Sequence, residues 1–147
     1  MSLEKAYGIC LYKKHKGSYK ILLCQSIDNP EKWGFLKGTR RDNETPRKAA
    51  IREFIEESSI TIDGKNLEDF FYQKNKNKDV GIFMFNGSNV KNLDSYFDGD
   101  KLKKRFVCAE NAQVKLFDIE DLPEIKTKQL SLVKKVVSVL SKKISDK

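Results

Sequence analysis

The segment from Gly38 to Ile60 reads G-T-R-R-D-N-E-T-P-R-K-A-A-I-R-E-F-I-E-E-S-S-I. Thr45 and Pro46 predict the start of a helix, because threonine is a favoured N-cap residue and proline is favoured at the first helical position. We therefore expect a helix from about Pro46 to Ser58. The apolar side of this helix would be formed by Ala49, Ala50, Phe54 and Ile51.

Three glutamates share one face of the expected helix, near its C-terminal end. Glu53, Glu56 and Glu57 have the spacing that brings their carboxylates to the same side. Their mutual repulsion destabilises the helix, and the negative end of the helix dipole adds to the cost. A hard divalent cation, which prefers oxygen ligands, would neutralise the cluster. The alternative is a solvated acidic helix face, and the spacing of the surrounding residues favours the metal site.

That wider spacing resembles the Nudix box, the signature of hydrolases that cut a nucleoside diphosphate linked to another group. The shared skeleton is Gly38, five residues, Glu44, seven residues, and then R-E-F-I-E-E from Arg52 to Glu57. Ser59 departs from the box, which usually has a glycine in a left-handed turn there, and a serine costs about 1 kcal/mol or a modified turn. The resemblance implies an α/β fold, a Nudix-type α/β/α sandwich with a mixed sheet between helices.

The resemblance also implies roles for these residues. Mg²⁺ or Mn²⁺ would be held by Glu53, Glu56 and Glu57 with the backbone carbonyl of Gly38. Glu53 is the candidate to accept the proton of the attacking water. Arg52 and Glu44 would orient the carboxylates through forked hydrogen bonds. The implied catalytic residues are Glu53, Glu57, Arg52 and Glu110.

Glu110 lies outside the box and opens the segment E-N-A-Q-V-K-L-F-D-I-E-D-L. In many Nudix enzymes a similar segment, with an acidic loop residue followed by a strand and an acidic turn, supplies a further carboxylate near the metals. The alternative is a plain surface glutamate.

The residues before the box suggest a substrate. W-G-F-L-K-G, from Trp33 to Gly38, resembles the W-G-F-P-K-G sequence of messenger-RNA decapping Nudix enzymes, including those of large DNA viruses, with Leu36 in place of proline. Alternatively, the aromatic residues of this stretch simply pack beneath the loop. Lys37, Arg40 and Arg41 would pair with substrate phosphates.

The main expectation for function is therefore metal-dependent hydrolysis of the cap of messenger RNA. One alternative is a hydrolase of diphosphoinositol polyphosphates or other small nucleoside polyphosphates. Another is a non-catalytic Nudix-like RNA-binding module, against which the intact R-E-F-I-E-E argues. The expected partner is thus capped RNA or a polyphosphorylated small molecule.

The positive net charge of the chain favours a polyanionic substrate. The chain has 147 residues and a formal net charge of +8, which suits one domain spanning residues 1–147 with a basic surface. The basic runs Lys74–Lys78 and Lys101–Arg105 are dense enough to predict contacts with an RNA backbone; the alternative is that lysines merely solubilise the surface. No DNA-binding motif is recognisable, so DNA is not an expected partner.

Other classes are disfavoured. The chain has no run of 18 apolar residues and no signal-peptide pattern at its start, so neither a membrane span nor secretion is expected. His15 is the single histidine, which excludes a Ser-His-Asp arrangement. Cys10, Cys24 and Cys108 fall in strand-like runs without C-x-x-C spacing, so we expect no zinc site or disulfide framework. A cytoplasmic location is expected, in the host cytoplasm for a viral enzyme, and the sequence carries no signal for an oligomeric state.

The remaining chain predicts two hairpins, a loop-rich insertion and a final helix. The first hairpin pairs 6–12 with 19–25 through a turn at 13–17, and the second pairs 69–73 with 80–86. A short strand or loop is expected at 33–37, an insertion at 88–100 and a strand at 114–117. The C-terminal helix is amphipathic, and its expected apolar stripe is Leu130, Val133, Val137, Leu140 and Ile144.

Overall fold

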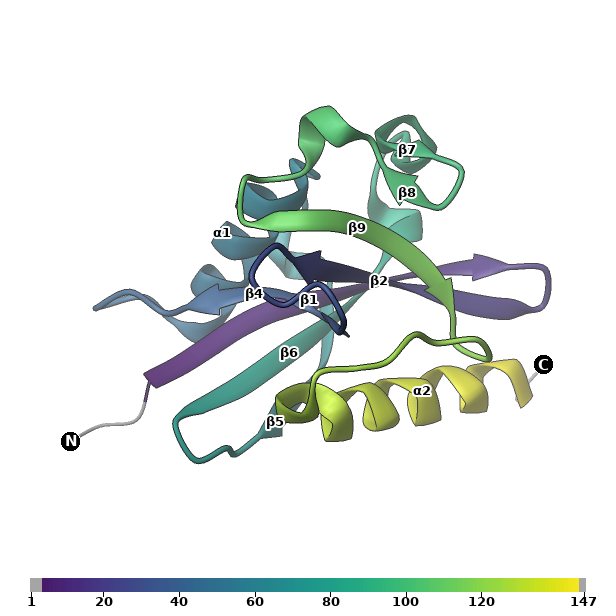
Figure 1. Cartoon of the computed structure of the whole chain (residues 1–147). Helices are drawn as coiled ribbons and strands as arrows, with labels where there is room; N and C mark the ends of the chain where they lie inside the picture. The colour runs from purple at the N-terminus through teal and green to yellow at the C-terminus, as the bar shows by residue number, and fades with distance from the viewer. Residues whose placement is uncertain (1–3, 146–147) are drawn as a thin grey trace.

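The structure, a computed structural model, describes residues 4–145, which form one sheet with a helix on each face (Figure 1). The strands are β1 (Glu4–His15), β2 (Ser18–Ser26), β3 (Trp33–Gly34), β4 (Leu36–Thr39), β5 (Leu67–Gln73), β6 (Lys78–Asn86), β7 (Phe97–Asp98), β8 (Lys101–Leu102) and β9 (Asn111–Asp118). The α-helices are α1 (Pro46–Ser58) and α2 (Leu130–Ser145). Short 3₁₀ helices are η1 (Gly64–Asn66), η2 (Gly87–Asn89), η3 (Leu93–Tyr96), η4 (Lys104–Phe106) and η5 (Thr127–Gln129).

The sheet is mixed, as the sequence predicts. Its strand order is β5-β6-β1-β2-β9-β8-β7, with β3 paired to β2 and β4 paired to β1. β1 and β6 run parallel, with Tyr7 opposite Gly81, and the other pairs are antiparallel. β5 forms one edge of the sheet, and its register against β6 shifts between Leu67 and Phe70. Because β1 and β6 are parallel neighbours, the segment that carries α1 must cross over one face of the sheet.

Each face of the sheet has its own hydrophobic core. On one face, Ala50 and Phe54 of α1 are completely buried. On the other, Leu132, Val136 and Leu140 of α2 are completely buried, and Figure 1 shows α2 running along that face. This arrangement confirms the predicted α/β/α sandwich.

The orientation of α2 about its own axis differs from the predicted stripe. Leu130, expected on the apolar face, is exposed, whereas Leu132 and Val136 are fully buried instead. Apolar residues occupy so much of the surface of α2 that their spacing alone does not determine which side of the helix packs on the sheet. The predicted residues that do pack on the sheet are Val133, Val137, Leu140 and Ile144.

Both predicted hairpins are present, and the strands are longer than expected. The first turn is tighter than the predicted turn at 13–17, because β1 continues to His15 and only Lys16 and Gly17 turn the chain. Both turn residues have positive φ, of 48° and 80°, as a two-residue hairpin turn requires. The insertion at 88–100 is loop-rich as predicted, with short 3₁₀ turns and β7. Cys108 lies in the loop before β9, so its predicted place in a strand was wrong.

α1 has the predicted bounds and the predicted start. Thr45 is the N-cap, and its side chain accepts a hydrogen bond from the backbone N–H of Lys48 at 3.2 Å. Pro46 occupies the first turn. The helix ends at Ser59, which has φ of 64° and donates its backbone N–H to the carbonyl of Ile55. Ser59 therefore adopts the left-handed conformation that the missing glycine would normally supply.

Replacing Ser59 with glycine is expected to raise the free energy of unfolding by about 0.5–1 kcal/mol, because glycine reaches a left-handed conformation without steric cost. Chemical denaturation of the metal-free protein measures this change. Ser58→Gly is the matched control with the opposite sign. Ser58 is buried within the helix, and its hydroxyl bonds the carbonyl of Phe54 and the N–H of Ile60. Equal effects of the two substitutions would contradict the left-handed assignment.

Within residues 4–145, neither α-helix is long and apolar enough to span a bilayer.

Candidate active site

Glu44 and Arg52 form the best-defined contact of the site. Arg52 donates from Nε to Oε2 of Glu44 at 2.6 Å and from Nη2 to Oε1 at 3.0 Å, a forked pair. The backbone N–H of Arg41 donates to the same carboxylate at 2.9 Å. The Arg52 hydrogen bonds, with help from this N–H, lower the pKa of Glu44 to about 2. Glu44 thus remains charged and fixes the guanidinium in place.

The other side of the guanidinium faces the acidic surface of α1. Nη1 of Arg52 donates to Oε2 of Glu53 at 3.0 Å and to Oε1 of Glu56 at 2.9 Å. Its Nη2 also donates to the backbone carbonyl of Thr39 at 3.2 Å. Arg52 therefore connects the loop, β4 and two of the three clustered carboxylates, which is the arrangement predicted for an orienting residue.

Gly38 lies in β4, directly against Glu53. A Cβ atom placed on Gly38 would lie 2.0 Å from the carboxyl carbon of Glu53, a distance at which the two groups cannot coexist. The absence of a side chain at Gly38 thus brings the β4 backbone next to this carboxylate.

Glu57 lies deeper than the other two glutamates. Its Oε1 accepts a hydrogen bond from Nδ2 of Asn111 at 3.2 Å. Burial is the main cause that raises the pKa of Glu57, to about 8, and the charge of Glu53 acts in the same direction while Asn111 opposes it. A carboxylate that is buried among other carboxylates is stabilised when a cation lies beside it.

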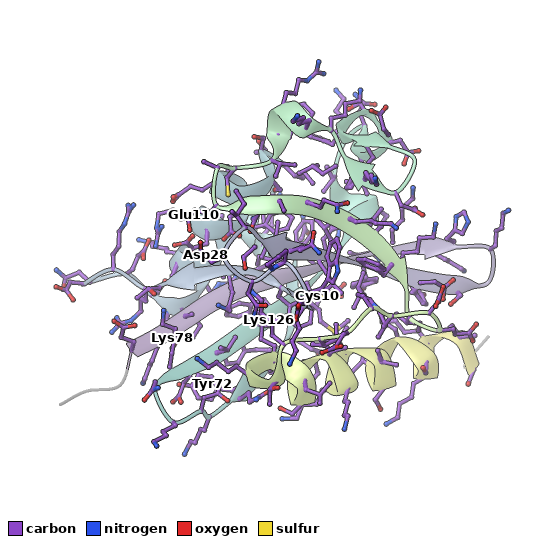
Figure 2. All side chains as sticks on the ribbon, in the orientation of Figure 1. Cys10, Asp28, Tyr72, Lys78, Glu110 and Lys126 are labelled. Atoms are coloured by element: carbon purple, nitrogen blue, oxygen red, sulfur yellow. The ribbon has the colours of Figure 1, made fainter. Side chains whose placement is uncertain are left out.

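A cavity of about 400 Å³ opens beside Glu57. Glu110, the predicted loop carboxylate, lines it together with Glu57 of α1. Asp28 lines it too, and Figure 2 shows Asp28 and Glu110 beside each other, with Lys126 below them. The cavity thus places carboxylates and an ammonium group around one space.

The predicted phosphate-binding residues lie in two different settings. Lys37 lines the cavity, and burial together with the nearby Lys126 and Lys78 lowers its pKa. Arg40 and Arg41 have exposed side chains in the loop before α1 and do not line this cavity. Nη1 of Arg40 donates to the backbone carbonyl of Glu44 at 3.0 Å.

Sequence reasoning missed several polar residues of the cavity, among them Asn111, Asp28 and Lys126. Asn111, which binds Glu57, follows Glu110 directly and could have been found from that segment. Asp28 lies in the loop after β2 and carries no motif. Lys126 precedes η5, far from the box in sequence, and only the folding of the chain brings it to the cavity.

The donor set fits a hard divalent metal. The three α1 carboxylates and the backbone carbonyl of Gly38, which lies against Glu53, would supply oxygen ligands. Within residues 4–145, no three acidic, cysteine or histidine side chains are already arranged as a metal site. Arg52 contacts Glu53 and Glu56, and Asn111 contacts Glu57.

Comparison with known proteins identifies relatives that act on small molecules. Over 86 residues the chain is 35% identical to the asymmetrical bis(5'-nucleosyl)-tetraphosphatase of Caenorhabditis elegans, covering 54% of this chain and 62% of that relative. Over 47 residues it is 40% identical to dihydroneopterin triphosphate diphosphatase of Haemophilus influenzae, covering 32% and 30% of the two chains. Both matches span less than two thirds of the relative's length.

Solved structures give the same fold over nearly the whole chain. A binary complex of the C. elegans Ap4A hydrolase superposes with a TM-score of 0.67 at 25% identity, covering 95% of this chain and 98% of that one. The NUDIX domain of Shewanella oneidensis NrtR, complexed with ADP ribose, superposes with a TM-score of 0.67 at 13% identity, covering 95% and 90%. The NUDIX domain family itself matches residues 3–136. This match covers most of the chain and shows that the chain belongs to the NUDIX family.

Proposed function

We propose that this chain is a metal-dependent pyrophosphohydrolase of small polyphosphorylated molecules, with a nucleoside polyphosphate as the substrate class. The cavity beside Glu57 carries the proposal, because it combines carboxylates that fit a divalent metal with Lys37 and Lys126, which fit phosphate. The relatives support the substrate class, since their names describe cleavage of a dinucleoside tetraphosphate and of a pterin triphosphate.

In this proposal different residues bind the metal, activate the attacking water and bind the substrate phosphates. Glu53, Glu56 and Glu57, with the carbonyl of Gly38, hold Mg²⁺ or Mn²⁺. When bound, the metal supplies charge stabilisation on phosphate oxygens and a more acidic water. Glu53 accepts the proton of the attacking water, and Glu110 provides a further carboxylate at the mouth of the cavity.

The basic residues and the support residues act on either side of this centre. Lys37 binds the phosphate chain inside the cavity. Arg40 and Arg41, which lie in the exposed loop, bind substrate phosphates outside it. Arg52 and Glu44 are positioning residues, because they hold the glutamates of α1 in rotamers that face one another.

Cleavage of capped RNA is the second candidate, and the placement of the basic runs weighs against it. The run Lys74–Lys78 lies at the turn into β6, and Lys101–Arg105 lies at β8 and η4, which are at opposite ends of the strand order. The two runs therefore do not form one continuous strip for an RNA backbone. Trp33 and Phe35, from the segment that resembles decapping enzymes, are buried in the core beneath α2.

The substrate class is tested by measuring kcat/KM for four substrates in Mg²⁺ or Mn²⁺ and in EDTA. These are a dinucleoside tetraphosphate, dihydroneopterin triphosphate, cap-labelled RNA and the free cap analogue. We expect the best small polyphosphate to exceed capped RNA by at least about tenfold in kcat/KM, and EDTA to abolish all turnover.

A salt series and the variant Lys103→Ala/Lys104→Ala provide the control. An RNA-binding enzyme loses affinity with a log–log slope of about 0.7 per phosphate contacted on a single strand. Preference for capped RNA over the cap analogue, with a steep slope that this variant reduces, would establish decapping instead. Absence of turnover with every substrate in either metal would remove the enzyme assignment.

A further inference from the structure

A second cavity, of about 500 Å³, adjoins the catalytic one. The two share Lys37, Lys126 and Gln129 in their linings, so they lie next to each other at these residues. We call the second cavity the lysine groove, after the lysines that line it; Figure 2 shows Lys78 and Lys126, which belong to β6 and to the segment before α2. These lysines are Lys32, Lys37, Lys78, Lys126 and Lys128.

The positive charge of the lysine groove is only partly neutralised. Lys78 contacts Glu4 at 3.3 Å, and Lys32 contacts Glu124 at 3.6 Å. Among residues 4–145, no carboxylate forms an ion pair with Lys37, Lys126 or Lys128. Like charges that face one shared space repel each other, and an anionic ligand there would relieve this repulsion.

The backbone that carries Lys126 and Lys128 is held from both sides. The backbone N–H of Lys126 donates to the carbonyl of Trp33 at 2.9 Å. From the other side, Nδ2 of Asn75 donates to the carbonyl of Lys128 at 3.1 Å, and Nε2 of Gln73 to that of Thr127 at 3.3 Å. The backbone of this segment is therefore in place before any ligand arrives, which lowers the entropic cost of binding.

Gln129 fixes this segment to the strand region that leads into the active site. Its Oε1 accepts the backbone N–H of Phe35 at 2.7 Å, and the side chain is 2% exposed. A Cβ on Gly34 would lie 2.7 Å from the Gln129 amide, so the glycine makes room for this contact. Lys37 and Lys126 are thus kept at the junction of the two cavities.

The chemistry of the lining favours phosphate over a nucleobase. Within the described part of the chain, no aromatic ring lines the lysine groove, whereas bases are usually held by stacking on aromatic side chains. The lining instead offers ammonium groups, with amide groups such as Asn29 and Asn77 between them. Several phosphates close together match this arrangement.

We propose that the lysine groove binds a phosphate-dense portion of the substrate that continues beyond the linkage being cut, entering past Lys37 and Lys126. This proposal rests on the proposed function, because it extends the phosphate path out of the catalytic cavity. It assigns Lys126 and Lys128 as specificity residues for substrates with clustered phosphates. Two sources share this chemistry: the linear phosphate chain of a nucleoside polyphosphate and the ring phosphates of a diphosphoinositol polyphosphate.

The test compares Lys128→Ala, at a lysine that lines the groove and not the catalytic cavity, with Lys135→Ala, which removes the same charge from the exposed side of α2. Calorimetry first measures the binding of inorganic tripolyphosphate to each protein in EDTA, where no turnover occurs. We expect the groove variant to raise Kd by about three- to tenfold, since one charged hydrogen-bonding group is lost, and the control to change it by less than about twofold.

Steady-state kinetics with Mg²⁺ then identify the source of the phosphates. A nucleoside 5'-tetraphosphate and a diphosphoinositol polyphosphate are compared, and the groove variant should raise KM with little change in kcat for the one that uses the groove. Lys128→Gln keeps most of the side-chain bulk and should give the same result, which separates lost charge from lost packing.

The outcomes separate this proposal from the proposed function. Weaker tripolyphosphate binding in the groove variants without cleavage of any substrate would uphold the groove and remove the enzyme assignment. Cleavage with unchanged Kd and unchanged KM for both substrates would uphold the enzyme and overturn the groove. Equal losses in the groove and control variants would also overturn it, because net charge alone would then explain the binding.

Discussion

Glu57→Gln is expected to lower kcat by more than about a hundredfold in saturating Mg²⁺, because the substitution removes a charged metal ligand while nearly preserving shape. Glu56→Gln should have a similar effect. The fold should survive, since Oε1 of glutamine can still accept the Asn111 hydrogen bond. Single-turnover kinetics with a dinucleoside tetraphosphate measure the loss of catalytic rate. Titration with the metal in a calorimeter measures the loss of metal binding.

The stability of the metal-free Glu57→Gln variant gives an independent check. The pKa of Glu57 is raised to about 8, so its charged form is disfavoured in the folded state, and wild-type stability falls as pH rises from about 4.3 toward 8. Glutamine does not titrate, so the variant should be at least as stable as wild type at pH 7 and lose this pH dependence. Lys135→Glu, a charge change on α2, is the control for general effects of charge. Near wild-type rates in both Glu56→Gln and Glu57→Gln would remove the metal assignment.

Gly38→Ala is expected to reduce kcat/KM by about a hundredfold, because a displacement of about 1 Å at a catalytic group has an effect of that size. The new methyl group would occupy the position of the Glu53 carboxylate, 2.0 Å from its carboxyl carbon. The group that must move is the end of a flexible side chain, so the free energy of unfolding should change much less than the activity. Thermal unfolding measures the change in stability, and initial rates on the same preparation measure the change in activity.

Gly64→Ala is the matched control for Gly38→Ala. Its new Cβ would lie 2.8 Å from Cδ1 of Ile51, on a side chain that takes no part in the site. Activity should therefore stay within about threefold of wild type even if stability falls. If Gly38→Ala retained full activity, Glu53 would not need its present position, and its roles in metal binding and proton transfer would both be rejected.

The local features of the site could be predicted from sequence because their causes are local. The start of α1 follows from Thr45 and Pro46, and the shared face of the glutamates follows from helical spacing. The resemblance implied that Arg52 contacts the nearby carboxylates, and its forked contact with Glu44 joins the helix to the preceding loop. In these cases the interacting residues lie within a few turns of one another in the chain.

The features that could not be predicted depend on contacts between distant segments. Asn111 reaches Glu57 only because β9 pairs with β2, and Gln129 reaches Phe35 across a separation of 94 residues. The two basic runs, Lys74–Lys78 and Lys101–Arg105, stand out in the sequence, whereas the lysine groove combines Lys78 of the first run with lysines from separate segments. Charge density along the chain therefore could not identify this groove, since only the fold decides which lysines face one another.

The register shift in β5 bears on how the protein behaves at high concentration. An edge strand exposes backbone groups to which a second chain can add, the usual start of edge-to-edge aggregation. β5 carries the exposed acidic residues Glu68 and Asp69 at this irregularity, between the two positions where pairing with β6 shifts. Negative charge and a broken ladder both oppose strand addition, and the opposite edge ends in β7, which is only two residues long. Both borders of the sheet thus oppose strand addition, so self-association through edge-to-edge pairing is disfavoured even in concentrated solution.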